Sequence, residues 1–98
     1  MYASVTTPSV QSGKMEEHIN TWRESVKPLV ESFPGFKNIY ALTNPETNRG
    51  MTIAFYETKA DAERTQSSGD YKKAVEMMAG TIVMGSIVRE GYEVSIQV

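Results

Sequence analysis

The sequence predicts an α+β fold, a ferredoxin-like split βαβ sandwich with a four-stranded antiparallel sheet. Three observations in the 98 residues support it. Strand-type patterns rich in Val, Thr, Tyr and Ile lie at both ends and in the middle of the chain. A long amphipathic helix follows the first of them, and a second helical region precedes the last. The order strand, helix, strand, strand, helix, strand is that of the split βαβ unit, whose helices cover one face of the sheet.

The first half of the chain predicts a strand over residues 2–10 and a helix over residues 14–32. Pro8 should lie near the strand end, because proline cannot donate to a ladder. Ser12 is the expected N-cap of the helix. Pro28 should kink the helix or end its regular part near Lys27. The buried stripe recurs every three or four residues at Met15, Ile19, Trp22, Val26, Leu29, Val30 and Phe33.

The second half begins with a predicted hairpin, in which strands over residues 36–43 and 51–57 flank the turn-rich segment NPETNRG. Thr58 should cap a short helix that ends near Ser67, and Asp70 should cap a further helix. Residues 81–88 fit either a helix end or a strand. Alternating apolar residues predict a final strand over residues 92–98.

Composition and charge narrow the classes of function. The formal net charge is −2 and Lys and Arg are scattered, so no basic face is expected for nucleic acid. The absence of cysteine excludes disulfides, thiolate catalysis and cysteine-ligated metals, and favours a cytoplasmic location. No signal-peptide pattern and no apolar run of about 18 residues is present, so no membrane partner is expected. We expect one domain over residues 1–98.

Neither face of the predicted hairpin is plainly polar. Its two faces carry either Phe36, Tyr40, Leu42, Met51, Ile53 and Phe55, or a remainder with Ile39, Ala41, Ala54 and Tyr56. Helices cover only one face of such a sheet, and a contiguous exposed apolar face favours association. We therefore expect a symmetric homodimer with two sheets packed face to face. The alternative is a monomer with a moderately apolar surface.

Five segments in this order carry a resemblance to a known family: GKMEEHINTW, FPGF, MTIAFYETKADAE, SGDYKKAV and GYEVSIQV. The sequence resembles the antibiotic-biosynthesis-monooxygenase-like (ABM) domain of the dimeric α/β-barrel superfamily. The resemblance implies a homodimeric barrel with a pocket between each sheet and its helices. Some members oxidise polycyclic phenols or quinols with oxygen and without a metal or added cofactor. Others degrade haem, and many have no known activity.

The haem-degrading branch of the family carries a Trp, a His and an Asn that this chain lacks. Laid on that pattern, the Trp position falls on Thr65, the His position on Val75 and the Asn position near Thr6. The resemblance therefore implies no haem degradation by that route and no cofactor.

His18 and Trp22 are the first candidates for chemistry. His18 is the only histidine, and it lies at the border of the helical stripe, where it would act as general base on a phenol. The alternative is a half-exposed border residue that bonds solvent or backbone. A single His without Cys does not favour a metal site. Trp22 would stack on an aromatic ligand or, as part of the stripe, belong to the core.

The remaining candidates are Asn38, Tyr40, Tyr56 and Tyr71. The phenols could hydrogen-bond a ligand carbonyl, although Tyr40 and Tyr56 have opposite strand parities. Asn38 lies among apolar neighbours, where a buried amide needs partners, unless it is exposed at the strand end. The predicted function is binding of a small, partly aromatic molecule by the homodimer, with cofactor-independent monooxygenation of a phenol or quinol. The alternative is a non-catalytic dimeric ligand-binding or structural module.

Overall fold

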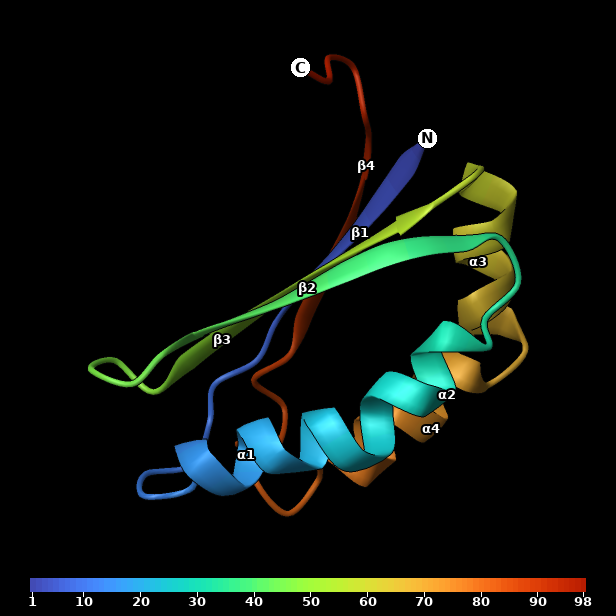
Figure 1. Ribbon diagram of the computed structural model, residues 1–98. Helices are drawn as coiled ribbons and strands as arrows, with labels where there is room; N and C mark the ends of the chain where they lie inside the picture. The colour runs from blue at the N-terminus through green and yellow to red at the C-terminus, as the bar shows by residue number, and fades with distance from the viewer.

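A computed structural model describes residues 1–98 and confirms the predicted α+β, ferredoxin-like fold. Four strands form one antiparallel sheet in the order β2-β3-β1-β4. They are β1 (Tyr2–Thr7), β2 (Phe36–Asn44), β3 (Arg49–Tyr56) and β4 (Val88–Glu93). The helices gather on one side of the sheet and leave its other face uncovered (Figure 1). We call this uncovered side the open face.

The long N-terminal helix has three parts: α1 (Met15–Thr21), a π-helical turn η1 (Trp22–Val26) and α2 (Lys27–Glu31). The backbone N–H of Lys27 donates to the carbonyl of Trp22, five residues earlier. Pro28 explains this widened turn, because it lacks an N–H and its ring would clash with the carbonyl four residues before it. The interruption predicted near Lys27 is therefore confirmed.

The predicted N-cap role of Ser12 is wrong. The helix begins after Lys14, without a side-chain cap. A turn over residues 11–14, in which Lys14 N–H donates to Gln11 O and Gly13 has a φ of 78°, separates Ser12 from the first helical residues. The Ser12 hydroxyl therefore cannot serve the free N–H groups of the first turn.

A bulge changes the faces of the hairpin. The register shifts between Phe36 and Asn38, so Phe36 lies opposite Tyr56, and their rings meet edge to face at 6.4 Å. Tyr40 instead packs on Phe55 at 6.3 Å, on the open face. The prediction that Phe36 shares a face with Tyr40 was wrong, because the extra residue of a bulge reverses the alternation of side chains before it.

The second helical region forms α3 (Lys59–Ser67) and α4 (Asp70–Met77). Thr58 caps α3 as predicted, since its hydroxyl accepts from Asp61 N–H at 3.1 Å. Asp70 is the first residue of α4, and Gly69, with a φ of 88°, occupies the N-cap position expected for it. Ile82 forms an isolated bridge with Val10 instead of extending the helical stripe.

The final strand lies earlier than predicted, at Val88–Glu93 instead of residues 92–98. Antiparallel pairing sets its end, because Glu93 lies opposite Tyr2 and Val94 N–H donates to Met1 O. β1 begins at Tyr2, so the paired part of β4 ends at Glu93, whatever the apolar alternation beyond it.

The core fills the space between the helices and the sheet. Its buried residues come from the long helix, β3, both later helices and the segment before β4: Val26, Val30, Phe33, Ala54, Tyr56, Ala62, Ala74, Met78 and Ile82. None of the helices has the length and apolar character needed to cross a membrane.

Candidate functional site

An apolar cavity of about 50 Å³ lies between the helices and the sheet. Trp22 and Val26 of the π-helical turn line it, with Ile39 and Tyr56 of the hairpin, Tyr71 of α4 and Arg89 of β4. We call it the Arg89 cavity. Twelve of its 18 lining residues are hydrophobic, so the few polar groups in its wall are the ones that could orient a ligand.

Arg89 is the charged group of this cavity. Its guanidinium carbon lies 4.6 Å from the centroid of the Tyr71 ring, in a cation–π arrangement. Nη1 donates to Gln66 Oε1 at 2.6 Å, which ties β4 to α3. Nε is buried and has no hydrogen-bond partner. A buried donor without a partner is costly, so Nε is available to an acceptor in the cavity.

Tyr56 lies beside this positive charge and is only 3% exposed. Burial raises the pKa of Tyr56, and the Thr65 side chain and the Arg89 charge oppose that rise. A phenol with the ordinary pKa of 10.0 is already protonated at neutral pH, and the shift is upward, so Tyr56 can donate a hydrogen bond to a ligand. Tyr56 and Arg89 thus place two donor groups at one cavity.

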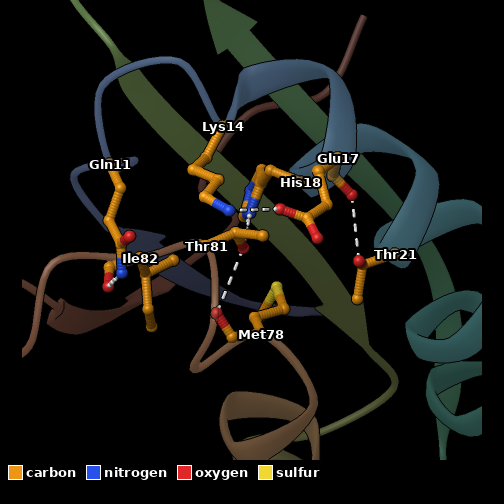
Figure 2. A network of polar contacts seen from close by, with 8 residues as sticks. All are labelled: Gln11, Lys14, Glu17, His18, Thr21, Met78, Thr81 and Ile82. Atoms are coloured by element: carbon orange, nitrogen blue, oxygen red, sulfur yellow. Dashed lines mark hydrogen bonds and ion pairs between the residues drawn. The ribbon is translucent and has the colours of Figure 1, made fainter.

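His18 is 2% exposed, so it is a buried residue, not the half-exposed border residue that the sequence left open. Its Nδ1 lies 3.0 Å from Thr81 Oγ1, and the Thr81 hydroxyl lies 3.1 Å from Met78 O, to which it donates (Figure 2). Since the Thr81 hydroxyl donates its hydrogen to Met78 O, it can only accept a hydrogen bond from His18, so His18 Nδ1 carries a hydrogen. This assignment makes Nε2 the unprotonated nitrogen. Burial also lowers the pKa of His18, which favours the neutral ring.

A second space of about 110 Å³, which we call the His18 hollow, lies on the other side of Trp22. Pro8, His18, Ile19, Trp22, Gly50 and Thr52 are among its lining residues. A methyl group built on Gly50 would lie 3.9 Å from His18 Nε2, so this nitrogen faces the hairpin side of the hollow. Trp22, Pro8 and Thr52 line both spaces, so the hollow and the Arg89 cavity are neighbours, and His18 lines only the hollow.

The structure brings only some of the predicted residues together. Trp22, Tyr56 and Tyr71 line the Arg89 cavity, whereas His18 lines the neighbouring hollow. Asn38 and Tyr40 line neither space, because they alternate onto the open face of β2, where Tyr40 is 55% exposed. In the single chain, Asn38 and Tyr40 therefore do not share a pocket with His18.

Sequence reasoning missed Arg89 and Thr81. Thr81 lies at the start of the ambiguous stretch over residues 81–88, and Arg89 lies between that stretch and the predicted final strand over residues 92–98. Assigning β4 to residues 88–93 would have placed Arg89 and Gly91 on the helix-facing side, and that alternation was the available signal. No group of three His, Asp or Glu side chains comes together in a way that could hold a metal ion.

The model of one protein family, described as antibiotic biosynthesis monooxygenase (ABM), matches residues 1–77. The chain belongs to this family. The match covers β1 through α4, so it includes the Trp22, Tyr56 and Tyr71 walls of the cavity and stops before Arg89. No curated protein matches the sequence of this ABM-family chain.

Solved structures share the ABM fold at low sequence identity. A putative antibiotic biosynthesis monooxygenase from Nitrosomonas europaea has a TM-score of 0.75 and 18% identity, covering 98% of this chain and 100% of that one. A putative counterpart from Bordetella bronchiseptica reaches 0.78 at 13% identity, with 97% of each chain covered. SnoaB, a cofactor-independent oxygenase from Streptomyces nogalater, reaches 0.77 at 11% identity, with coverage of 98% and 94%. At these identities the likeness shows the fold alone.

Proposed function

We propose that this ABM-family chain binds a small, partly aromatic molecule with an acidic hydroxyl, a phenol or quinol, in the Arg89 cavity. The observation that carries the proposal is the buried, unpartnered Nε of Arg89, the one charged residue that lines this mostly apolar space. A phenolate oxygen would accept from Nε while the ring packs among Trp22, Val26 and Ile39. Tyr56 and Tyr71 would flank the oxygen.

As the reaction, we propose cofactor-independent monooxygenation of the bound phenol. Phenol and O₂ give quinone and water. One oxygen atom becomes the new ring carbonyl, the other leaves as water, and the ring supplies all four electrons. Arg89 would stabilise the electron-rich phenolate that reacts with oxygen, and the apolar walls would keep water from competing. No external reductant is needed in this scheme.

His18 would act as a base only on a ligand that extends past Trp22. Its Nε2 is the unprotonated nitrogen and faces the hollow, so it could take the proton of a second hydroxyl there. The present volumes require movement, since about 150 Å³ is needed to hold benzene. Rotation of Trp22 would join the Arg89 cavity to the His18 hollow.

The small volume of the Arg89 cavity, about 50 Å³, favours the second candidate function, a non-catalytic binding or structural module. Typical ligand pockets enclose about 300–1,000 Å³. If Trp22 does not move, the cavity is a packing defect and Arg89 serves only to tie α3 and α4 to β4 through Gln66 and Tyr71.

Oxygen uptake separates the two functions. Wild-type protein would be assayed with naphthol and anthrone, beside the variants Arg89→Gln and His18→Ala. We expect uptake above the protein-free rate, a loss of at least about tenfold in Arg89→Gln, and product quinone in a one-to-one ratio with oxygen. Equal rates with and without protein would leave only the binding module. Equal rates in wild type and His18→Ala would remove His18 from the reaction.

We also propose that a second copy of this chain covers the open face. Exposed apolar residues of three strands gather there, namely Tyr40, Leu42, Met51, Val88 and Tyr92, at 38–62% exposure. Exposure of a contiguous apolar face to water is unfavourable, and a partner related by a two-fold axis would cover it with the same residues. In this arrangement Asn38 and Tyr40 would contact the partner and not the ligand.

A further inference from the structure

His18 offers a hydrogen-bond acceptor to a space that nothing in the chain fills. His18 is only 2% exposed. Its Nδ1 is held by the hydrogen bonds that connect it through Thr81 to Met78 (Figure 2). Nε2 makes no hydrogen bond to another side chain or backbone group. It faces the His18 hollow across from Gly50.

We propose that, with Trp22 in the position it has in this structure, the His18 hollow is a second ligand site beside the Arg89 cavity, for a small neutral molecule that donates one O–H hydrogen bond to His18 Nε2. The ligand class is a small alcohol with an apolar body. This inference does not depend on the oxidation proposed above, and it requires neither a phenol nor oxygen.

The size of the hollow sets the size of the ligand. A cavity of about 150 Å³ holds the six carbons of benzene, so a hollow of about 110 Å³ suits about four or five non-hydrogen atoms. Three of the ten lining residues, His18, Thr43 and Thr52, have polar side chains and half are hydrophobic, so water alone would leave the apolar part of the wall without a contact. Ile19, Trp22 and Pro8 would contact the carbon body, and Thr52 is a further polar residue of the wall.

Charged groups do not compete for Nε2 within the hollow, because none of its lining residues other than His18 is titratable. On the same helix, Lys14 and Glu17 pair with each other at 3.2 Å and are about half exposed. On the other side of the ring, Thr81 and Met78 are uncharged. The site therefore selects a neutral donor and not an ion.

The test is a titration with isopropanol and acetone, which have the same number of non-hydrogen atoms and nearly the same shape. Only isopropanol can donate. The readouts are the nitrogen chemical shift of His18 Nε2 and the methyl shifts of Ile19 and Thr52 in the full-length protein. We expect saturable isopropanol binding with a roughly millimolar dissociation constant and binding of acetone at least about tenfold weaker.

Gly50→Ala is the matched variant. The added methyl would lie 3.5 Å from Pro8 Cγ and 3.9 Å from His18 Nε2, both ordinary contacts, so it occupies the hollow without strain. The affinity for isopropanol should fall at least about tenfold in Gly50→Ala, while the amide NMR spectrum of the variant remains that of a folded protein. The proposal would be overturned if isopropanol bound Gly50→Ala as tightly as wild type, or if acetone bound as tightly as isopropanol. It would also be overturned if isopropanol caused no shift at His18 Nε2, which would show that the hollow holds only water. Oxygen uptake with naphthol tests the proposed oxidation independently, so failure of the alcohol site and failure of the oxidation can be told apart.

Discussion

His18 couples folding to pH. Burial lowers its folded pKa below the ordinary value of 6.5, so the unfolded chain takes up the proton first as pH falls. Stability is then fully present above about pH 6.5 and is lost as pH falls from there toward the folded pKa. The loss is about 1.4 kcal/mol for each pH unit between the two pKa values. Urea unfolding between pH 5 and 7.5 measures it.

His18→Gln is the control for this pH dependence, because glutamine keeps a donor for Thr81 and does not titrate. The variant should be less stable than wild type at pH 7.5 and should show a flatter pH profile over the same range. A wild-type slope that persists unchanged in His18→Gln would assign the dependence to another group.

At the level of single residues, sequence identified His18 and Trp22 but could not locate their surroundings. The helical period placed Trp22 on the buried stripe and His18 at its border, which is a local property. Arg89 was not identified from the sequence because its partners are far away along the chain. Tyr71 on α4 and Gln66 on α3 precede it by 18 and 23 residues, and only folding brings them into contact. Asn38 and Tyr40 were misplaced for a related reason, since their face depends on which side the helices cover.

The π-helical turn is the element that positions Trp22 between the two spaces. Pro28→Ala restores an N–H that can bond the carbonyl of Glu24 and so favours a regular α-helix through this region. We expect a changed near-ultraviolet circular dichroism signal from Trp22, the only tryptophan, and a stability change below about 1 kcal/mol. Glu31→Ala, a change at an exposed residue whose pair with Lys27 is solvent-accessible, should leave the signal unchanged. An unaltered Trp22 signal in Pro28→Ala would separate the proline from the π turn.

Helices, caps and turns that depend on nearby residues could be predicted from the sequence. Strand boundaries and bulges that depend on a paired strand could not. The proline, the Thr58 cap and the hairpin all have short-range causes, and the structure confirms them. The bulge at Phe36 and the end of β4 at Glu93 depend on pairing with β3 and β1. The tail at 94–98 has strand-type alternation but no strand beside it, so the pattern alone placed the final strand too late.

For the whole molecule, the open face links the fold to assembly. Tyr40→Asp puts a charge among the apolar residues of that face, and light scattering at micromolar concentration should then report the mass of one chain, where wild type reports two. Met84→Asp is the control, since Met84 is 81% exposed in a turn away from the sheet and should leave the dimer intact. A wild-type protein with the mass of one chain would reject the face-to-face dimer.

We infer that residues 1–98 act as one domain, because β4 completes the sheet beside β1 and supplies Arg89 to a cavity otherwise built from the first 87 residues. The charged end of the cavity thus comes from the last strand of the chain and its aromatic walls from the segments before it. Loss of β4 would remove the proposed function together with one edge of the sheet.

The most direct test of ligand binding in the Arg89 cavity is a methyl NMR titration of the wild-type protein with naphthol. Val26, Val75 and Ile87 line the cavity, while Ile53 and Val88 report on the open face. We predict saturable shifts confined to the cavity methyls and their loss in Arg89→Gln. Shifts confined to Ile53 and Val88, or no saturable shift at all, would contradict the Arg89 cavity as a ligand site.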